Sequence, residues 1–157
     1  MIEPSNDLRT AASRFASGVT VVTTARDGDL HGMTASSFAS VSLEPPLVLI
    51  SLDKSSRTRG IVLEVGTFAI NILSSEQETV ARAFAVRGDK TFESVPYHLD
   101  ESGAPFLDEA LASLSCLTVE VVAGGDHDVF IAEVIRVEAR PGEPLLYFDR
   151  AYRRLSG

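Results

Sequence analysis

The sequence is poor in the residues that several common chemistries require. It has one cysteine, Cys116, and no tryptophan among its 157 residues. A single cysteine excludes an intramolecular disulfide and leaves no thiol cluster for zinc or an iron–sulfur group. We therefore expect Cys116 to be a small buried apolar residue. With only three Tyr and eight Phe, few side chains can stack on a flat ligand, and Phe38, Phe84 and Phe92 are the candidates.

Long apolar runs and basic segments are also missing. No run approaches the roughly 20 apolar residues that span a bilayer, and residues 1–7 lack the pattern of a secretory signal. Fourteen basic against twenty-two acidic side chains give a net charge of −8, which repels nucleic acids. We therefore expect a cytoplasmic protein with no membrane or nucleic-acid partner. The length predicts a single domain over residues 1–157.

The apolar pattern predicts strands that are joined mostly by hairpins. Before them, an apolar stripe at positions 8, 11, 12 and 15 predicts an initial helix. Asp27-Gly28 predicts a tight turn, because it separates a β-branched strand from a second strand. Strands are expected at residues 19–24, 31–38, 47–50, 67–73, 115–123, 129–139 and 145–148.

Short helices interrupt this β pattern. One is expected over residues 55–65, and Ser75-Glu76-Gln77-Glu78 has the spacing of a capping box before a helix that runs through Phe84. Residues 85–113 hold several turn formers and are expected to form a loop. Six or seven strands with only short helices predict a mainly β, antiparallel barrel.

The most informative stretch runs from His31 to Leu52. Gly32-Met33-Thr34-Ala35-Ser36-Ser37-Phe38 is followed by Ser42-Leu43-Glu44-Pro45-Pro46 and then by an apolar strand that ends in Ser51. Small hydroxyls, exposed backbone amides and a proline pair therefore lie between two strands. This combination suits a flat polar heterocycle that carries a phosphate tail.

With these residues, the chain resembles the flavin reductase family, the small NAD(P)H-dependent partners of two-component flavin monooxygenases. The resemblance continues in Asp89-Lys90-Thr91-Phe92, in Gly125-Asp126-His127-Asp128-Val129-Phe130, and in Leu146-Tyr147-Phe148 with Tyr152-Arg153. It implies an FMN-binding split barrel and a homodimer, with FAD or FMN bound near the subunit interface. It also implies NADH as the hydride donor, with NADPH as the alternative, and a partner monooxygenase that receives the reduced flavin.

The resemblance further assigns roles to individual residues. Contacts to the isoalloxazine edge are implied for Thr34, Ala35, Ser36 and Ser37. The ribityl chain would be lined by Ser51 and Leu52, and the phosphate held by Ser55, Ser56 and Thr58. Lys90 and Phe92 would lie beside the flavin. His127 would sit over the flavin face at the nicotinamide, as the catalytic residue, and Tyr152 would help to close that site.

Hydride transfer from nicotinamide C4 to flavin N5 needs no protein nucleophile or metal, because the cofactors carry the hard step. The protein supplies stacked geometry and hydrogen bonds to the reduced flavin.

Simpler structural roles stay open for the same residues. Ser55, Ser56 and Thr58 could be ordinary helix caps, and His127 could be a turn residue.

Three other functions also remain open. One is a flavoprotein oxidase similar to pyridoxamine-phosphate oxidase, and another is a non-catalytic flavin-binding module. The third is a barrel-type carrier of apolar ligands, against which the hydroxyl-rich Thr34–Ser37 segment argues.

Overall fold

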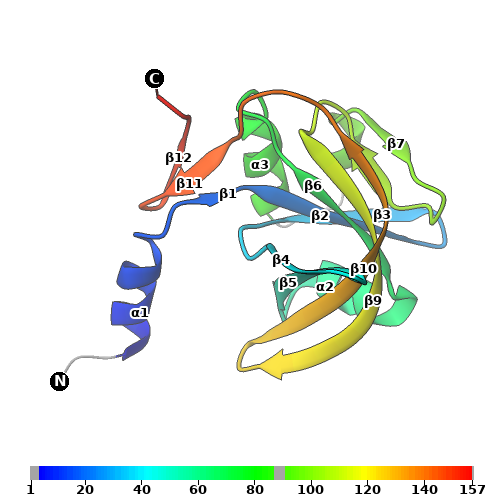
Figure 1. The fold of residues 1–157 in the computed structure, drawn as a ribbon, viewed down its shortest axis with the longest axis horizontal. Helices are drawn as coiled ribbons and strands as arrows, with labels where there is room; N and C mark the ends of the chain where they lie inside the picture. Colours follow the sequence, from blue (N-terminus) through cyan, green and yellow to red (C-terminus); the bar gives the residue numbers. More distant parts are fainter. Residues whose placement is uncertain (1–3, 87–90, 157) are drawn as a thin grey trace.

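The computed structural model describes residues 4–86 and 91–156, and β strands dominate it (Figure 1). Seven strands form one antiparallel sheet in the order β3-β2-β6-β9-β10-β5-β4. They are β2 (Thr20–Arg26), β3 (Asp29–Ala35), β4 (Ala39–Leu43), β5 (Pro46–Asp53), β6 (Thr67–Ile72), β9 (Ala112–Gly124) and β10 (His127–Ala139). The prediction of a mainly β, antiparallel fold with six or seven strands is confirmed. Within the described residues the sheet stays open, because its two outer strands, β3 and β4, do not pair with each other.

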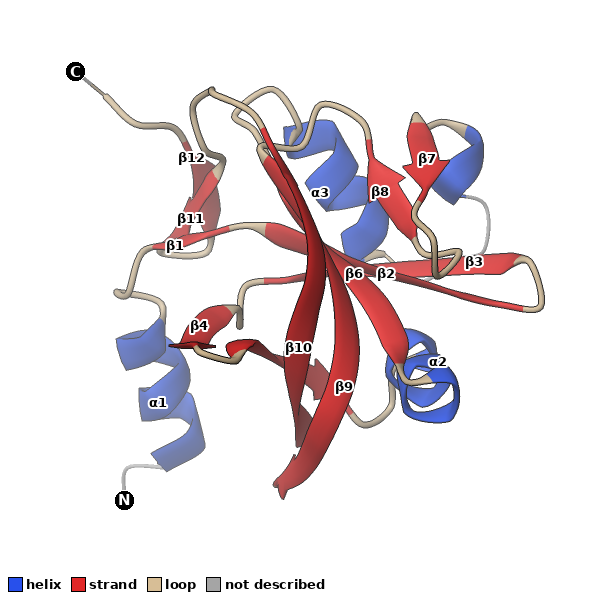
Figure 2. Ribbon diagram, turned by 45° about the vertical axis from the view of Figure 1, so that its right-hand side comes forward, coloured by secondary structure: helices blue, strands red, loops and turns tan. Residues whose placement is uncertain are grey.

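Smaller elements surround this sheet (Figure 2). One small sheet contains β1 (Ser17–Gly18), β11 (Leu146–Phe148) and β12 (Ala151–Arg153), and a second contains β7 (Tyr97–Leu99) and β8 (Pro105–Leu107). The helical elements are α1 (Pro4–Ala12), α2 (Arg57–Val65), α3 (Glu78–Ala85) and the short 3₁₀ helix η1 (Thr91–Glu93). Helices α2 and α3 both contact β2 and β3, whereas α1 projects away from the main sheet.

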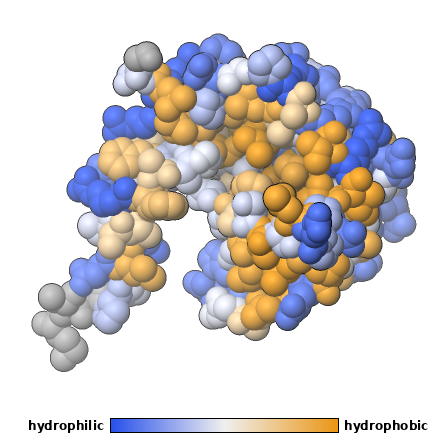
Figure 3. Space-filling model, viewed as in Figure 1, coloured by the Kyte–Doolittle hydropathy of each residue, from blue (hydrophilic) through white to orange (hydrophobic). Residues whose placement is uncertain are grey.

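The initial helix forms as predicted, but its apolar stripe has no covering element among the described residues. Leu8 is 68% exposed, and Phe15, just beyond the helix, is 82% exposed. Figure 3 shows apolar residues along α1 and over the face that bears β9 and β10. The 3.6-residue period therefore predicted the helix correctly without predicting which surface would cover it.

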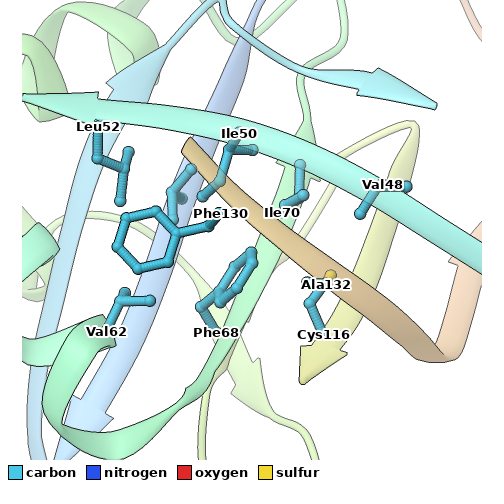
Figure 4. Close-up of a cluster of buried hydrophobic side chains, with 10 residues drawn as sticks. Val48, Ile50, Leu52, Val62, Phe68, Ile70, Cys116, Phe130 and Ala132 are labelled. Carbon is cyan, nitrogen blue, oxygen red and sulfur yellow. The ribbon is translucent and has the colours of Figure 1, made fainter. Parts of the chain in front are cut away.

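The main hydrophobic core is formed by buried side chains of the main sheet together with Val62 of α2. Along β5 every second side chain is buried, which places Ile50 and Leu52 against Phe130 (Figure 4). The Phe68 and Phe130 rings meet edge to face with their centroids 6.5 Å apart. Burial of each such side chain contributes about 1.5–3 kcal/mol relative to its exposure. This core anchors the ends of β3 and β5, where the chain leaves the sheet.

Several expectations about local structure were wrong. The capping box at residues 75–78 is not formed, because Gln77 is itself the N-cap of α3 and its side-chain oxygen accepts the backbone N–H of Ser74 at 3.0 Å. The expected loop at residues 85–113 contains η1, β7, β8 and the start of β9, and strands β4 and β12 were missed. The tight turn at Asp27-Gly28 is confirmed, with both residues at positive φ (53° and 84°).

Candidate functional site

A cavity of about 820 Å³ lies where β3, the start of α2, the end of α3 and the β11–β12 hairpin meet. Its volume falls within the usual range for ligand pockets, about 300–1,000 Å³. Many predicted site residues line it: Thr34, Ala35, Ser36, Ser55, Ser56, Thr58, Phe92 and Tyr152. The structure therefore brings together residues from four distant segments that the sequence analysis assigned to one site.

Other predicted site residues lie outside the cavity wall. The Ser37 hydroxyl donates to the carbonyl oxygen of Ser51 (2.8 Å) and accepts from the Ser51 amide (3.0 Å), so it ties the end of the motif to β5. The Leu52 side chain is fully buried in the core. Lys90 lies outside the described residues.

Strand β3 offers its backbone to the cavity more than its hydroxyls. The Thr34 hydroxyl donates to the carbonyl oxygen of Ala81 at 2.6 Å, which fixes β3 to α3. Ser36 is exposed at the cavity wall. Because β3 is an outer strand of the sheet, the N–H and C=O groups on its open edge can hydrogen-bond to a ligand.

The cavity wall at the start of α2 combines helix capping with a place for an anion. Ser56 is the N-cap, and its side chain accepts the backbone N–H of Arg59 at 3.2 Å. Both the amide and the hydroxyl of Ser55 donate to Asp53 Oδ1, at 2.8 and 2.7 Å. The first amides of a helix lack intrahelical partners and attract negative charge, and Arg57 adds a cation to this wall. The capping role of Ser56 is confirmed, and the same residue lines the cavity.

Aromatic rings form the opposite wall. The Phe84 and Phe92 rings lie edge to face with centroids 5.0 Å apart, and those of Tyr147 and Tyr152 are 5.3 Å apart. Burial raises the pKa of the Tyr152 phenol above its ordinary value, so this hydroxyl stays protonated at neutral pH. The wall thus offers flat apolar surface together with a hydrogen-bond donor.

Basic side chains also lie on this wall, and one of them, Arg82, was missed by the sequence analysis. The Arg82 guanidinium lies over the Tyr152 ring, 4.9 Å from its centroid, and donates to Glu78 Oε1 at 2.8 Å. Arg150 also lines the cavity, from the β11–β12 turn. The spacing of 78, 82 and 85 along α3 could have indicated a shared helix face, but only the fold shows that this face meets the cavity.

Gly32 has a steric reason to be glycine. A Cβ atom built on it would lie 2.7 Å from Phe84 Cε1 and 2.9 Å from Phe84 Cδ1. Carbon atoms normally approach no closer than about 3.5 Å. The absence of a side chain in β3 therefore allows the Phe84 ring to lie against the strand.

His127 lies on β10, next to the strand that carries the cavity residue Asp53. It begins β10, directly opposite Asp53 of β5, and Asp53 lines the cavity. Its Nδ1 is 2.7 Å from Asp126 Oδ1, and its side chain is 41% exposed. His127 itself is not among the residues that line the cavity.

Two further features bear on the chemistry. Cys116 is buried as expected, and burial raises the pKa of its thiol to about 12, which leaves it unreactive at neutral pH. Among residues 4–86 and 91–156, no group of three or more His, Cys, Asp or Glu is placed to hold a metal ion. In the same part of the chain, no helix has both the length and the apolar character needed to cross a membrane.

Known proteins are similar to this chain over most of its length. Residues 12–156 match the flavin reductase like domain. The chain is 40% identical to the reductase component of a 4-nitrophenol 4-monooxygenase/4-nitrocatechol 2-monooxygenase from Rhodococcus opacus, over 90% of this chain and 76% of that protein. It is 38% identical to an FMN reductase (NADH) of Agrobacterium fabrum, over 98% of this chain and 88% of that protein.

A solved structure extends this similarity to the fold. The NADH:FAD oxidoreductase SgcE6 of Streptomyces globisporus C-1027, in complex with NAD and FAD fragments, superposes with a TM-score of 0.94 at 39% identity. The superposition covers 99% of this chain and 96% of that one. The chain belongs to the flavin reductase family.

Proposed function

We propose that this protein is an NADH-dependent flavin reductase that passes hydride from nicotinamide C4 to flavin N5 and supplies reduced FAD or FMN to a monooxygenase. The observation that carries the proposal is the cavity itself. It joins an open strand edge, a helix N-terminus and an aromatic wall, which together match a flat heterocycle with an anionic tail. The relatives named above, an NADH-dependent FMN reductase and a monooxygenase reductase component, support the same function.

The residues present fit a flavin. The backbone of Thr34–Ser36 and the Phe92 ring would hold the isoalloxazine. Ser55, Ser56 and Thr58 would hold the phosphate at the start of α2. The clamp between Ser37 and Ser51, with Leu52 behind it, would shape the ribityl side.

A bound flavin would supply the hydride-accepting atom, and this chain's side chains would orient the donor. His127 would contact the nicotinamide at the open side of the cavity, and Tyr152 would close the other side as a neutral hydrogen-bond donor. The aromatic wall would exclude water from the reacting atoms. The proposal thus assigns positioning and hydrogen bonding to the protein, and it requires no covalent step on a side chain.

We also propose that the protein is a homodimer. Contiguous exposed apolar surface on a soluble protein is typical of an interface. The outer faces of β9 and β10 expose Val119 (52%), Ile135 (63%) and Val137 (56%), and Leu43 of β4 is 88% exposed. Helix α1 exposes a second apolar surface, its uncovered stripe. A sedimentation equilibrium experiment that gives the mass of a single subunit would contradict this proposal.

We place the protein in the cytoplasm, where its single free thiol would stay reduced, and treat residues 1–157 as one functional domain. The function is tested by NADH oxidation at 340 nm, with and without added FMN or FAD and repeated with NADPH. We expect turnover that depends on added flavin and is faster with NADH. Bound flavin without NADH oxidation would instead favour a flavin-binding module or an oxidase.

A further inference from the structure

A partly buried ion pair joins α2 to β10 at the edge of the site. Asp128 follows His127 in β10, and its side chain is only 6% exposed. Arg59, in the first turn of α2, donates from Nε to Asp128 Oδ2 at 2.6 Å, and its Nη2 contacts the same oxygen. Neither residue lines the cavity, and the function proposed above gives neither a role.

Backbone contacts place this pair between the two halves of the site. The amide of Lys54 donates to the carbonyl oxygen of Asp126 at 2.9 Å, and His127 faces Asp53 across the β5–β10 ladder. The Arg59 amide also donates to the Ser56 hydroxyl that caps α2. Arg59 is therefore bound at its backbone to the proposed phosphate site and at its side chain to the neighbour of His127.

The geometry makes this pair more rigid than an exposed one. Two guanidinium nitrogens contact one buried carboxylate oxygen, and charge-assisted contacts of this kind hold both groups in one geometry. By comparison, the ion pair between Arg26 and Glu64 lies on the surface, with both side chains more than a third exposed. The start of β10 is thus fixed to α2 by side chains as well as by the ladder.

We propose that Arg59 and Asp128 are a positioning pair, which sets where His127 stands relative to the helix N-terminus that holds the flavin phosphate. This inference rests on the proposed function and on the nicotinamide role of His127. The pair touches neither substrate, so its effect on NADH must pass through His127. Loss of the pair should therefore weaken the use of NADH more than the binding of flavin.

The test uses Asp128→Asn, which removes the charge but keeps the size and an acceptor. We expect kcat/KM for NADH to fall between about tenfold and a hundredfold, because small misplacements of a reacting group have effects of this size. The dissociation constant for FMN, measured by quenching of flavin fluorescence, should change less than about twofold, because the displaced group, His127, is assigned to the nicotinamide and not to the flavin. Arg59→Lys, which keeps the charge but loses the planar fork, should give an intermediate loss.

Two further variants distinguish a positioning role of the pair from a simple loss of stability. In a His127→Ala protein, Asp128→Asn should cause no further loss in kcat/KM for NADH, because the group that it positions is absent. Phe106→Leu, in a separate part of the core, serves as a control of comparable thermal destabilisation that should leave kcat/KM for NADH unchanged. If Asp128→Asn does not fold, Arg59→Lys carries the same comparison.

The outcomes distinguish this inference from the function on which it rests. A wild-type protein that does not oxidise NADH with added flavin overturns both. An active wild type overturns the positioning role alone if Asp128→Asn keeps its kcat/KM. The same holds if its loss is equal with and without His127, if Phe106→Leu produces an equal loss, or if His127→Ala itself has no effect.

Discussion

Replacing Gly32 by alanine tests how closely the cavity is packed. The new Cβ would lie 2.7 Å from Phe84 Cε1 and 3.4 Å from Phe92 Cζ. Because Phe84 is only 3% exposed and packs on Phe92, its ring has little room except toward the cavity. Overpacking of this kind costs about 1–3 kcal/mol. Alanine recovers about 0.5–1 kcal/mol of the backbone entropy that glycine loses in a strand.

We therefore expect Gly32→Ala to lower the free energy of unfolding by about 1–2 kcal/mol. For a chain of this length, this corresponds to a fall in melting temperature of about 2–8 °C. A ring displaced into the cavity should also weaken FMN binding. Circular dichroism on heating measures the first effect, and quenching of flavin fluorescence measures the second.

Two further variants make the result decisive. Gly60→Ala is the control, because a Cβ at this helical position would meet no atom within 4 Å beyond the adjacent residues and the backbone of its own helix, and it should raise stability slightly. Phe84→Leu combined with Gly32→Ala should recover part of the loss, because the smaller side chain relieves the contact. A Gly32→Ala protein with wild-type stability and wild-type FMN affinity would refute the steric reasoning.

Four other changes test separate parts of the structure. Replacing Ser55 and Ser56 together by alanine should weaken FMN binding more than riboflavin binding; equal losses would mean that they are only caps. Asp53→Asn should strengthen binding of FMN but not of riboflavin, because it removes a negative charge beside the proposed phosphate site. Quenching of flavin fluorescence measures both affinities. Asn71→Leu should cost at least about 3 kcal/mol in urea unfolding, because the buried amide makes four hydrogen bonds whose partners would lose them. His98 lies between the carboxylates of Asp108 and Glu138, and the hydrogen bond with Asp108 is the main cause of its raised pKa. The stabilisation by the protonated ring should therefore be fully present below about pH 6.5 and lost as pH rises through the raised pKa. The stability difference between wild type and His98→Asn should thus be larger at pH 5.5 than at pH 8.5, and below about 1 kcal/mol because the ring is half exposed.

Elements with local signals were predictable from the sequence. Asp27-Gly28 marks its turn through residues that tolerate positive φ, and Ser56 marks the start of α2 through its capping hydroxyl. Strand β11 was predicted, but β12 and the hairpin that it forms with β11 were missed, because the turn uses Asp149 and Arg150 at positive φ (50° and 64°), without a glycine or asparagine to signal it. Strand β4 was missed because its pairing with β5 defines it, while four of its five side chains are exposed.

The same distinction between local and distant signals applies to the candidate site. The sequence identified hydroxyl residues that line the cavity, since their motif is continuous along β3 and at the start of α2. It could not show that the Thr34 hydroxyl is bound to α3, or that the Ser37 hydroxyl is bound to β5, because both partners are distant in sequence. Arg82 was missed for a related reason: its contribution depends on the rotation of α3 against the cavity.

From the charges around the proposed phosphate site, we expect a flavin to be held only loosely. The helix N-terminus and Arg57 attract a phosphate. However, the Asp53 carboxylate lines the same cavity and already accepts the amide and hydroxyl of Ser55, so a phosphate there must compete with a fixed negative charge for these donors. At about 4 Å, each unit of like charge costs on the order of 1 kcal/mol even in water, and more where water is excluded. Weak binding is what a reductase needs if its reduced flavin is to leave for a second protein, because a tightly held flavin would stay after hydride transfer. We therefore expect removal of this charge in Asp53→Asn to strengthen the binding of FMN, which carries the phosphate, and to leave riboflavin binding unchanged.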